Sequence, residues 1–524
     1  MRLPILFAVG TLLGSTAHAL EVLYVTDSGL DKVLRFADLN SDGDYQDAGE
    51  VTTFYDDTLG PYMLSANNGI CTDPGGTIYV ADSTEDCIFA MRDTNADGDA
   101  NDAGETTIFF DGRAGGNGSG VLMTSAADLH YEAGNSTFWV ASSNTTAGGN
   151  DAILRVHDLN ADGDANDVGE AVEYYVEPAG SVGDYIPSAT TFGPDGKLYM
   201  SENGTLAGVR GIYRFDDLDN SGLIDQPGEK TFFFQPPAQA GTAFHWNMEV
   251  DANGWFYLTD TGNDLWWRVK DLNLDGDAND AGEFAIVWTA GVASNVWDLV
   301  FGADGTIYAG ESQTPDRILH LNDLDANGTI SGGLPETADV FNDTGTVPDA
   351  LNDPRGLVIG KPLSVGTPYC FGDGTGTACP CGTGVAGNGC PNSLNPNGAN
   401  LAGTGVASVV NDTVLFTASG VPNGPGRYFQ GTTQLGAGGG LAFGDGLRCA
   451  GGSVIRLGIV VAASNTSTYP SGVTAPNNVP VSIKGFCLSG DVRNYQLWYR
   501  DSDPVYCTGA VFNLTNAVNL VWQP

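Results

Sequence analysis

The sequence predicts an all-β protein, a six-bladed β-propeller followed by a disulfide-containing β-sandwich. An aromatic strand recurs six times, at spacings of 55, 60, 60, 58 and 51 residues, which is typical of stacked or radial β units. The 73 glycines and 25 prolines supply many tight turns, and seven of the nine cysteines follow residue 360. The recurring aromatic residues are Tyr24, Tyr79, Trp139, Tyr199, Tyr257 and Tyr308.

Composition excludes several classes of function. The 524 residues include 21 Lys and Arg against 64 Asp and Glu, a formal net charge of −43. This balance argues against nucleic acid and anionic membrane surfaces as partners. Because charged residues make up only 16% and hydrophobic residues 42%, the chain is not a disordered acidic tail.

Residues 1–19 are predicted to be a secretory signal peptide. Arg2 provides the basic end, Leu6 to Leu13 the apolar segment, and Ala17-His18-Ala19 the cleavage site. The apolar segment is too short for a membrane anchor, and no later segment approaches 18 apolar residues, so no membrane span is expected. We therefore expect a secreted or cell-surface protein.

The cysteines are interpreted as disulfides, since the predicted location is oxidising. Cys370, Cys379, Cys381 and Cys390 follow a C-x8-C-x-C-x8-C spacing, which is not that of a zinc ribbon or finger. Zinc remains the alternative there, and the odd number of cysteines leaves at least one thiol unpaired.

Residues 20–360 are assigned to the propeller, with four short strands per repeat. A β-helix is the alternative architecture, but its repeats are usually shorter. The first repeat lacks the strand that precedes the aromatic one, and Arg355–Ile359 can supply it from the far end, which removes two sheet edges. In the fourth repeat the predicted strands are Ala189–Phe192, Lys197–Ser201, Gly211–Phe215 and Lys230–Phe234.

An acidic loop follows the third strand of each repeat. Five of the six copies fit D-x-[ND]-x-[DNS]-G-x-x-x-[DQ]-x-G-E, and the six loops hold 27 of the 64 acidic residues. Oxygen ligands at positions 1, 3 and 5, with glycine at position 6, are how a short loop wraps Ca²⁺. Without a cation these carboxylates repel one another. The alternative interpretation is a solvated acidic turn. The candidate ligands are Asp38, Asn40, Asp42, Asp44, Asp47, Glu50, Asp93, Asn95, Asp97, Asp99, Asp102, Glu105, Asp158, Asn160, Asp162, Asp164, Asp167, Glu170, Asp217, Asp219, Ser221, Asp225, Glu229, Asp271, Asn273, Asp275, Asp277, Asp280, Glu283, Asp323, Asp325 and Asn327.

The loops resemble EF-hand and dockerin calcium loops over about a dozen residues each. The resemblance implies Ca²⁺ as the ion. Two departures are that the closing acid stands at position 13 and that strands flank the loop. We therefore expect structural calcium and no helix-opening switch.

The strand pairs Asn68–Asp82, Ser188–Glu202 and Trp297–Glu311 resemble NHL-repeat and gluconolactonase (regucalcin) propellers. Aligning the inner strands puts Gly69, Asp128, Ala189, Asn247, Asp298 and Gly356 at one position. Asp128, Asn247 and Asp298 are therefore candidate ligands for one more metal ion at the mouth of the axial funnel. The resemblance implies a metal-dependent lactonase or sugar-oxidising enzyme, although the family's acid on the first inner strand is missing here. His245 and Glu249 are the catalytic candidates, with His130 nearby. By propeller geometry, the acidic loops are expected on the face opposite the funnel mouth.

After a linker at 361–369, residues 370–524 are predicted to form the sandwich. Predicted strands include Val414–Ala418, Val454–Val461, Tyr495–Tyr499 and Leu520–Trp522. Tyr369–Asn392, Tyr495–Asp501 and Phe512–Ala517 resemble a C-terminal module of secreted proteins of planctomycete-type bacteria. The module contains no histidine, so no Ser/His/Asp arrangement is available.

Three functions remain open from the sequence. The first is an extracellular binding, adhesion or scaffold protein with structural calcium, whose partner is a glycan or an extracellular protein. The second is a metal-dependent lactonase or a sugar dehydrogenase-like enzyme acting in the funnel. The third is a purely structural surface-layer component.

Overall fold

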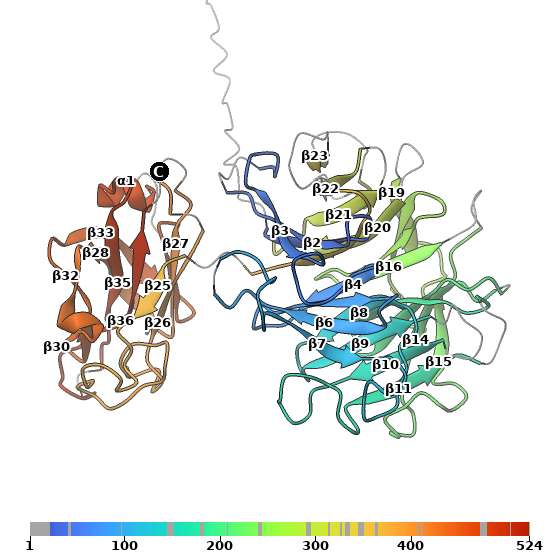
Figure 1. Cartoon of the computed structure of the whole chain (residues 1–524), viewed down its shortest axis with the longest axis horizontal. Helices are drawn as coiled ribbons and strands as arrows, with labels where there is room; N and C mark the ends of the chain where they lie inside the picture. Colours follow the sequence, from blue (N-terminus) through green and yellow to red (C-terminus); the bar gives the residue numbers. More distant parts are fainter. Residues whose placement is uncertain are drawn as a thin grey trace, which may run out of the picture. The chain divides into compact units, whose positions relative to one another are not determined.

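The structure is a computed structural model (Figure 1). It describes residues 21–39, 43–95, 97–143, 151–178, 183–206, 208–238, 244–289, 295–312, 315–324, 327–330, 336–343, 351–361, 365–405, 407–409, 412–471, 479–503 and 505–522. The predicted signal peptide lies outside these residues. Two compact units separate near residue 361, one of Leu20–Asp38 with Gly43–Lys361 and one of Pro362–Pro524.

The described residues of the first unit form six antiparallel four-stranded sheets, the blades of a propeller. This confirms the predicted all-β class. From the inner strand outward, the blades are β24, β1, β2, β3 (Pro354–Ile359, Leu23–Asp27, Lys32–Phe36, Val51–Asp56); β4 to β7 (Asn67–Thr72, Ile78–Asp82, Cys87–Met91, Thr106–Asp111); β8 to β11 (Ala126–Glu132, Thr137–Ser142, Ala152–Val156, Ala171–Val176); β12 to β15 (Pro187–Phe192, Leu198–Glu202, Gly211–Phe215, Lys230–Phe234); β16 to β19 (His245–Val250, Phe256–Asp260, Leu265–Val269, Phe284–Thr289); and β20 to β23 (Asn295–Phe301, Ile307–Ser312, Arg317–Leu321, Thr337–Asn342).

The first blade is closed by the far end of the propeller sequence. Strand β24 pairs with β1 in antiparallel register, with Leu23 opposite Ile359 and Val25 opposite Leu357. The N- and C-terminal ends of the propeller sequence thus share one sheet. This was predicted from the absence of an inner strand in the first repeat. Closure leaves no open edge between the first and last repeats.

The aromatic strands recur because they pack neighbouring blades together. Tyr79 of β5 lies 4.5 Å, ring centroid to ring centroid, from Phe138 of the next blade, and Phe109 lies 4.6 Å from Phe138. Tyr199 of β13 lies 4.5 Å from Phe256 of the following blade. Buried aromatic pairs of this kind stabilise the blade interfaces beyond their burial alone.

The acid that ends most aromatic strands ties the incoming loop to its blade. Asp82 is fully buried, and its carboxylate accepts hydrogen bonds from the amides of Ser65, Ala66, Thr84 and Glu85 at 2.8–3.1 Å. Such bonds satisfy loop amides that would otherwise be buried without partners. The acid of the repeating motif is thus a structural clasp.

Glu202, at the same place in the fourth blade, makes stability depend on pH. It is fully buried, and burial raises its pKa to about 8 from the ordinary 4.5. The stability that the protonated group contributes is complete below pH 4.5 and is lost as the pH rises toward 8. We expect Glu202→Gln to gain melting temperature over wild type more at pH 9 than at pH 5, by scanning calorimetry. Partly exposed Glu85→Gln is the matched control, and an equal Glu202→Gln difference at both pH values would contradict the account.

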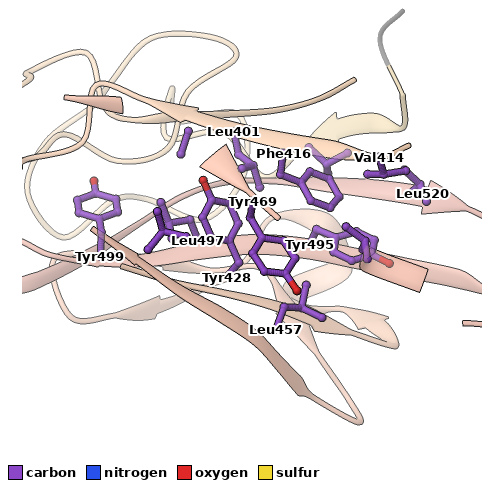
Figure 2. Close-up of a cluster of buried hydrophobic side chains, with 14 of the residues drawn as sticks. Leu401, Val414, Phe416, Tyr428, Leu457, Tyr469, Tyr495, Leu497, Tyr499 and Leu520 are labelled. Atoms are coloured by element: carbon purple, nitrogen blue, oxygen red, sulfur yellow. The ribbon is translucent and has the colours of Figure 1, made fainter. Parts of the chain in front are cut away.

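The second unit is a β-sandwich. Its core lies between the two sheets, and Tyr428, Tyr469 and Phe416 are among its buried side chains (Figure 2). Tyr428 and Tyr469 stack at 5.4 Å, and Phe416 lies 4.6 Å from Tyr495, both between ring centroids. The five-stranded sheet has the order β25, β36, β35, β28, β33 (Thr367–Tyr369, Phe512–Val521, Val492–Arg500, Gly424–Gly431, Ile455–Ala462), and the three-stranded sheet β26, β27, β34 (Asn400–Thr404, Leu415–Ser419, Thr466–Tyr469).

Smaller elements flank these sheets. They are the hairpins β29–β32 (Thr433–Gln434, Ala450–Gly451) and β30–β31 (Leu441–Phe443, Gly446–Arg448), a short 3-10 helix Leu435–Gly438 and helix α1 (Val481–Gly485). The last three residues of the predicted linker are the edge strand β25. No helix among the described residues has the length and apolar character needed to cross a bilayer.

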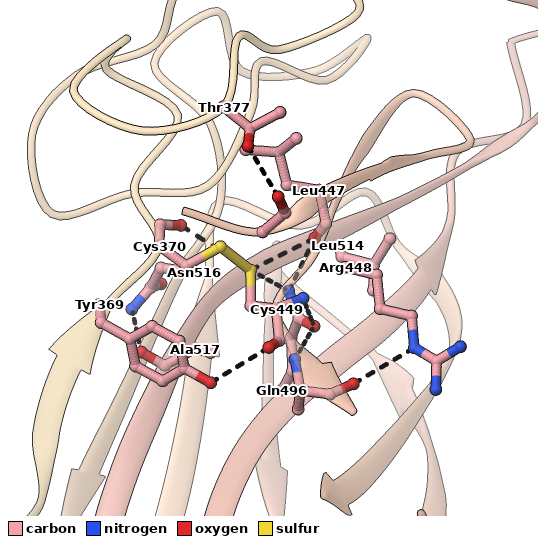
Figure 3. Close-up of a disulfide and its surroundings, with 12 residues drawn as sticks. Tyr369, Cys370, Thr377, Leu447, Arg448, Cys449, Gln496, Leu514, Asn516 and Ala517 are labelled. Atoms are coloured by element: carbon pink, nitrogen blue, oxygen red, sulfur yellow. Dashed lines mark hydrogen bonds between the residues drawn. A yellow bond between two sulfur atoms is a disulfide. The ribbon is translucent and has the colours of Figure 1, made fainter. Parts of the chain in front are cut away.

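Three disulfides staple the second unit, and they take the place of the zinc alternative. Cys370 pairs with Cys449, a bond that lies beside the buried Gln496 side chain (Figure 3). The Gln496 Nε2 donates to the carbonyls of Leu447 and Thr515 at 2.9 and 2.7 Å, which fixes the hairpin to the sheet. The other pairs are Cys379–Cys390 and Cys381–Cys507, and the unpaired cysteines are Cys71, Cys87 and Cys487.

Candidate functional site

The acidic loops join the third and fourth strands of the blades, as predicted. In every copy the opening aspartate accepts a hydrogen bond from the amide of the glycine at position 6, at 2.8–3.2 Å. These glycines have φ values between 82° and 106°, a conformation that favours glycine. The recurrent glycine is thus required by the sharp turn. The bonded pairs are Asp38 with Gly43, Asp93 with Gly98, Asp158 with Gly163, Asp217 with Gly222, Asp271 with Gly276 and Asp323 with Gly328.

The glutamate at position 13 is buried and closes the loop through backbone amides. Glu229 accepts from Leu218 at 2.9 Å and from Asp225 and Gln226 at 2.9 and 2.8 Å. These hydrogen bonds hold the pKa of Glu229 below its ordinary value, and the bond from the Gln226 amide has the largest effect. Glu105, Glu170 and Glu283 make corresponding bonds to their own loops. From the sequence these glutamates were expected only as ligands, and the closing of the loop by their hydrogen bonds to its amides was not predicted.

Within the part of the chain that the structure describes, two loops bring carboxylates close enough for one ion. Oxygens of Asp97, Asp99 and Glu105 lie within 4.8 Å of one another, and so do those of Asp217, Asp219 and Glu229. Opposite ligands of one Ca²⁺ stand about 5 Å apart, so these sets fit its size. The candidate ligands Asn40, Asp42 and Asp325 lie outside the described residues.

Asparagine amides stand between carboxylates at position 3 of three loops. The Nδ2 of Asn95 donates to Asp97 at 3.1 Å and to Asp102 at 2.7 Å. The same pair of bonds recurs at Asn160 and at Asn273. The amide group is therefore a positive pole between two acids, at the position where the calcium interpretation places the ion.

Arginines from the preceding blade reach four of the loops, a contact that the sequence analysis missed. Arg155 of β10 donates from Nη1 to the Gly222 carbonyl of the next blade's loop at 3.3 Å. The guanidinium groups of Arg35, Arg214 and Arg268 lie beside Gly98, Gly276 and Gly328. The only available signal was the regular placement of these arginines, each paired across β strands with a residue of the aromatic strand.

The axial candidates share one ring of the propeller. In strand pairing, Gly69, Asp128, Ala189, Asp298 and Gly356 oppose equivalent positions of their neighbouring strands, and Asn247 follows the same bulge in β16. Every inner strand has an irregularity just before this position. The sequence alignment of the six inner strands therefore agrees with their structural register.

Acids of this ring bind the free edge of the next inner strand. Asp128 Oδ2 accepts from the Thr190 amide at 2.9 Å, and Asp298 Oδ2 accepts from the Leu357 amide at 2.5 Å. Inner strands present unpaired amides to the channel, so these carboxylates satisfy them. The Oδ1 of Asn247 is buried and has no hydrogen-bond partner among the described residues.

A cavity of about 170 Å³ lies on the axis beside this ring. Asp128, Asn247, Asp298, Glu249 and His130 line it together with Cys71, two threonines and apolar side chains, and no lysine or arginine is among its lining residues. The carboxylates of Asp128, Glu249 and Asp298 do not all lie within 4.8 Å of one another, so one ion could take all three only after side-chain movement.

The electrostatics of the cavity follow from burial next to like charges. Burial raises the pKa of Asp128 to about 6 and that of Glu249 to about 8. The negative charge of Asp128 further raises the pKa of Glu249. The pKa of Asp298 is raised well above its ordinary value for the same two reasons. Burial lowers the pKa of His130 to about 4, so its imidazole is neutral at pH 7. A cation bound here would relieve the repulsion among the acids.

One sequence expectation about the axis differs from the structure. His245 does not line the cavity; it is fully buried, with Nε2 3.9 Å from Asp260 Oδ2. The cavity extends toward Thr72 and Tyr131, at the C-terminal ends of the inner strands. Strand register places the acidic loops at this same end of the blades, opposite the N-terminal starts of the inner strands.

An aromatic group lies on the N-terminal side of the ring. Arg355 stacks over Trp297, with its guanidinium carbon 3.8 Å from the ring centroid, and Trp297 contacts Trp246 edge to face at 5.0 Å. Arg355 also pairs with Asp353 at 2.7 Å. The basic residue that replaces the expected acid of the first inner strand is thus engaged away from the cavity.

Comparison with known proteins gives remote similarities of fold. No protein-family model matches the chain, and no curated protein sequence matches it. Among solved structures, the periplasmic gluconolactonase of Pseudomonas aeruginosa is 15% identical, with a TM-score of 0.41 over 76% of this chain and 92% of that one. A Xanthomonas campestris gluconolactonase is 16% identical (TM-score 0.37; 55% and 78%). Virginiamycin B lyase of Staphylococcus aureus is 13% identical (TM-score 0.34; 56% and 73%).

Proposed function

We propose that this chain is an extracellular, metal-dependent hydrolase of small lactones, whose axial cavity binds a divalent cation. Its acidic loops bind structural Ca²⁺. The observation that carries the proposal is the lining of the cavity, which contains three carboxylates and an unpartnered amide oxygen but no lysine or arginine. Buried acids without a counter-charge are costly, so they favour a bound cation.

The ring residues supply the ligands. Asp128 and Asp298 each use one oxygen to hold the next inner strand, which fixes the orientation of the carboxylate and leaves lone pairs for an ion. Asn247 contributes the free Oδ1. Rigid strands hold all three, and hard oxygen ligands suit Ca²⁺.

The chemistry requires a polarised carbonyl and an activated water. A divalent cation in the ring supplies Lewis-acid polarisation of a lactone carbonyl. The neutral imidazole of His130 can accept the proton of the attacking water, and Glu249 stands as the second proton-transfer group of the cavity. When the ring C–O bond breaks, that proton passes to the leaving alkoxide, which gives the hydroxy acid. A cavity of about 170 Å³ restricts the substrate to a small cyclic ester.

The loops serve a different purpose in the same proposal. Ca²⁺ among the carboxylates removes their repulsion and fixes each hairpin between the third and fourth strands of a blade. Since the loops also contact arginines of the preceding blades, ion binding stabilises the blade interfaces. The inner strands, which carry the ring, are thereby held in place.

Proton release from a panel of γ- and δ-lactones tests the proposed activity. The full chain should hydrolyse at least one of them with Ca²⁺ or Mn²⁺ present, and it should lose this activity after chelation and regain it when the cation is restored. A wild-type chain that binds cations but hydrolyses none of the panel would contradict the enzyme. That result would favour the extracellular binding or scaffold function instead.

A further inference from the structure

The two units differ sharply in charge. Residues 362–524 contain six basic and six acidic residues, so the whole formal charge of −43 belongs to residues 1–361. The acids of the second unit are each engaged, among them Asp491 with Arg493 and Asp501 with Ser393. Its basic residues are Arg427, Arg448, Arg456, Lys484, Arg493 and Arg500.

Half of these basic residues line one pocket on the outer face of the five-stranded sheet. The pocket has a volume of about 480 Å³ and is lined by Arg427, Phe429, Phe443, Arg448, Val454, Arg456, Trp498 and Leu514. Strand alternation produces this face, since Tyr428 and Leu497 point into the core while their neighbours Arg427 and Trp498, paired across β28 and β35, point away from it. Strands β28, β33 and β35 lie together in Figure 1.

The arginines of this pocket have no acidic partner. Among the described residues, no ion pair includes Arg427, Arg448 or Arg456, and Arg448 donates only to the carbonyl of Ala450, at 3.2 Å. Arg500, next to the pocket, lies 5.4 Å from the Trp498 ring centroid, and it too lacks an ion pair among these residues. Like-charged guanidinium groups repel one another, so their convergence favours an anionic ligand.

The rest of the lining is aromatic and apolar. Trp498 lies 5.5 Å and Phe443 5.1 Å from Phe512, ring centroid to ring centroid, so the rings form one continuous group. Phe443 is 44% and Val454 38% exposed, so both are accessible to a ligand. The pocket thus offers flat apolar surface beside guanidinium forks.

We propose that this pocket binds an anionic sugar unit of a polysaccharide, one that carries a carboxylate or a sulfate ester. Guanidinium groups bind such oxyanions through paired hydrogen bonds, and the ring faces suit the C–H faces of a pyranose. A volume of about 480 Å³ is enough for one or two sugar units. This inference does not depend on the proposed lactonase activity.

Titration calorimetry tests whether this pocket binds anionic sugars. It uses the calcium-loaded full chain, desalted to remove free Ca²⁺. The probes are oligogalacturonate, sulfated dextran oligosaccharide and unmodified dextran oligosaccharide of similar length. We expect one of the anionic probes to bind, which identifies the carboxylate or the sulfate as the preferred group, and the neutral dextran not to bind. The double variant Arg427→Gln with Arg456→Gln should bind at least tenfold more weakly, whereas Lys484→Gln, which removes one charge outside the pocket, should bind as wild type does.

Several results would overturn the proposal. They are equal affinity of the double variant and wild type, equal loss in Lys484→Gln, and binding of neutral dextran as tight as that of the anionic probes. Binding of phosphatidylglycerol vesicles or single-stranded DNA through these arginines, with no binding of any glycan, would also reject it. Unchanged melting temperatures of the variants show that a loss of binding is not a loss of folding.

Discussion

Chelation with EDTA is expected to lower the melting temperature of the full chain by about 10 °C or more. Each site that is filled at 100 times its Kd adds about 2.7 kcal/mol of stability. In a unit of this size, 1 kcal/mol corresponds to roughly 2 °C. Loss of the ions from several loops therefore sums to a large shift, to which the repulsion among carboxylates such as Asp97 and Asp99 contributes. Scanning calorimetry before and after chelation measures the effect.

Loop variants show whether the effect belongs to the acidic loops. The double variant Asp217→Asn with Asp219→Asn removes two charges from one close set, so its melting temperature should respond less to chelation than that of wild type. Asp503→Asn, in the second unit, should respond as wild type does. A melting temperature that EDTA leaves unchanged would reject structural calcium and favour the solvated acidic turn.

Asp298→Asn is expected to reduce kcat/KM for lactone hydrolysis by at least about 100-fold. Electrostatic groups that stabilise a transition state, and groups that orient metal ligands, are worth factors of this order. Asparagine keeps one oxygen to accept the Leu357 amide, so the contact between inner strands survives, while the charge is lost and the Leu299 amide loses its acceptor at 2.7 Å. Initial rates over a range of cation concentrations measure the change.

The same series separates metal binding from folding. The variant should require more cation for half-maximal rate than wild type, and its melting temperature, measured in parallel, separates this effect from the loss of the Leu299 hydrogen bond. Asp503→Asn carries the same charge change away from the axis and should match wild type in rate. Equal kcat/KM and equal cation dependence in Asp298→Asn and wild type would remove Asp298 from the site.

Much of the propeller could be predicted because its signals are local and repeat. Period-two alternation and the Gly193–Gly196 turn define strands of the fourth blade, whose predicted and observed bounds differ by at most two residues. Because the first repeat lacks an inner strand, residues near Arg355 were predicted to supply it, and the pairing of β1 with β24 confirms this. Register along equivalent strands then aligned Asp128, Asn247 and Asp298 correctly.

The remaining features depend on contacts between distant residues. Nothing in the local sequence shows that the Glu229 carboxylate accepts hydrogen bonds from backbone amides, or that Arg155 contacts the loop of the next blade. The position of the axial cavity depends on which side of the ring large side chains fill, and Trp246, Trp297 and Arg355 fill the N-terminal side. Cysteine spacing alone leaves many pairings possible, so the bond Cys381–Cys507 could not be deduced.

The most direct test is a crystal structure of the full chain grown with Ca²⁺, with anomalous scattering used to locate the ions. We expect anomalous peaks within the acidic loops and one in the axial cavity, bound by Asn247 Oδ1 and by oxygens of Asp128 or Asp298. Well-ordered density that shows water alone in the cavity, with the ring carboxylates unchanged, would contradict the central claim.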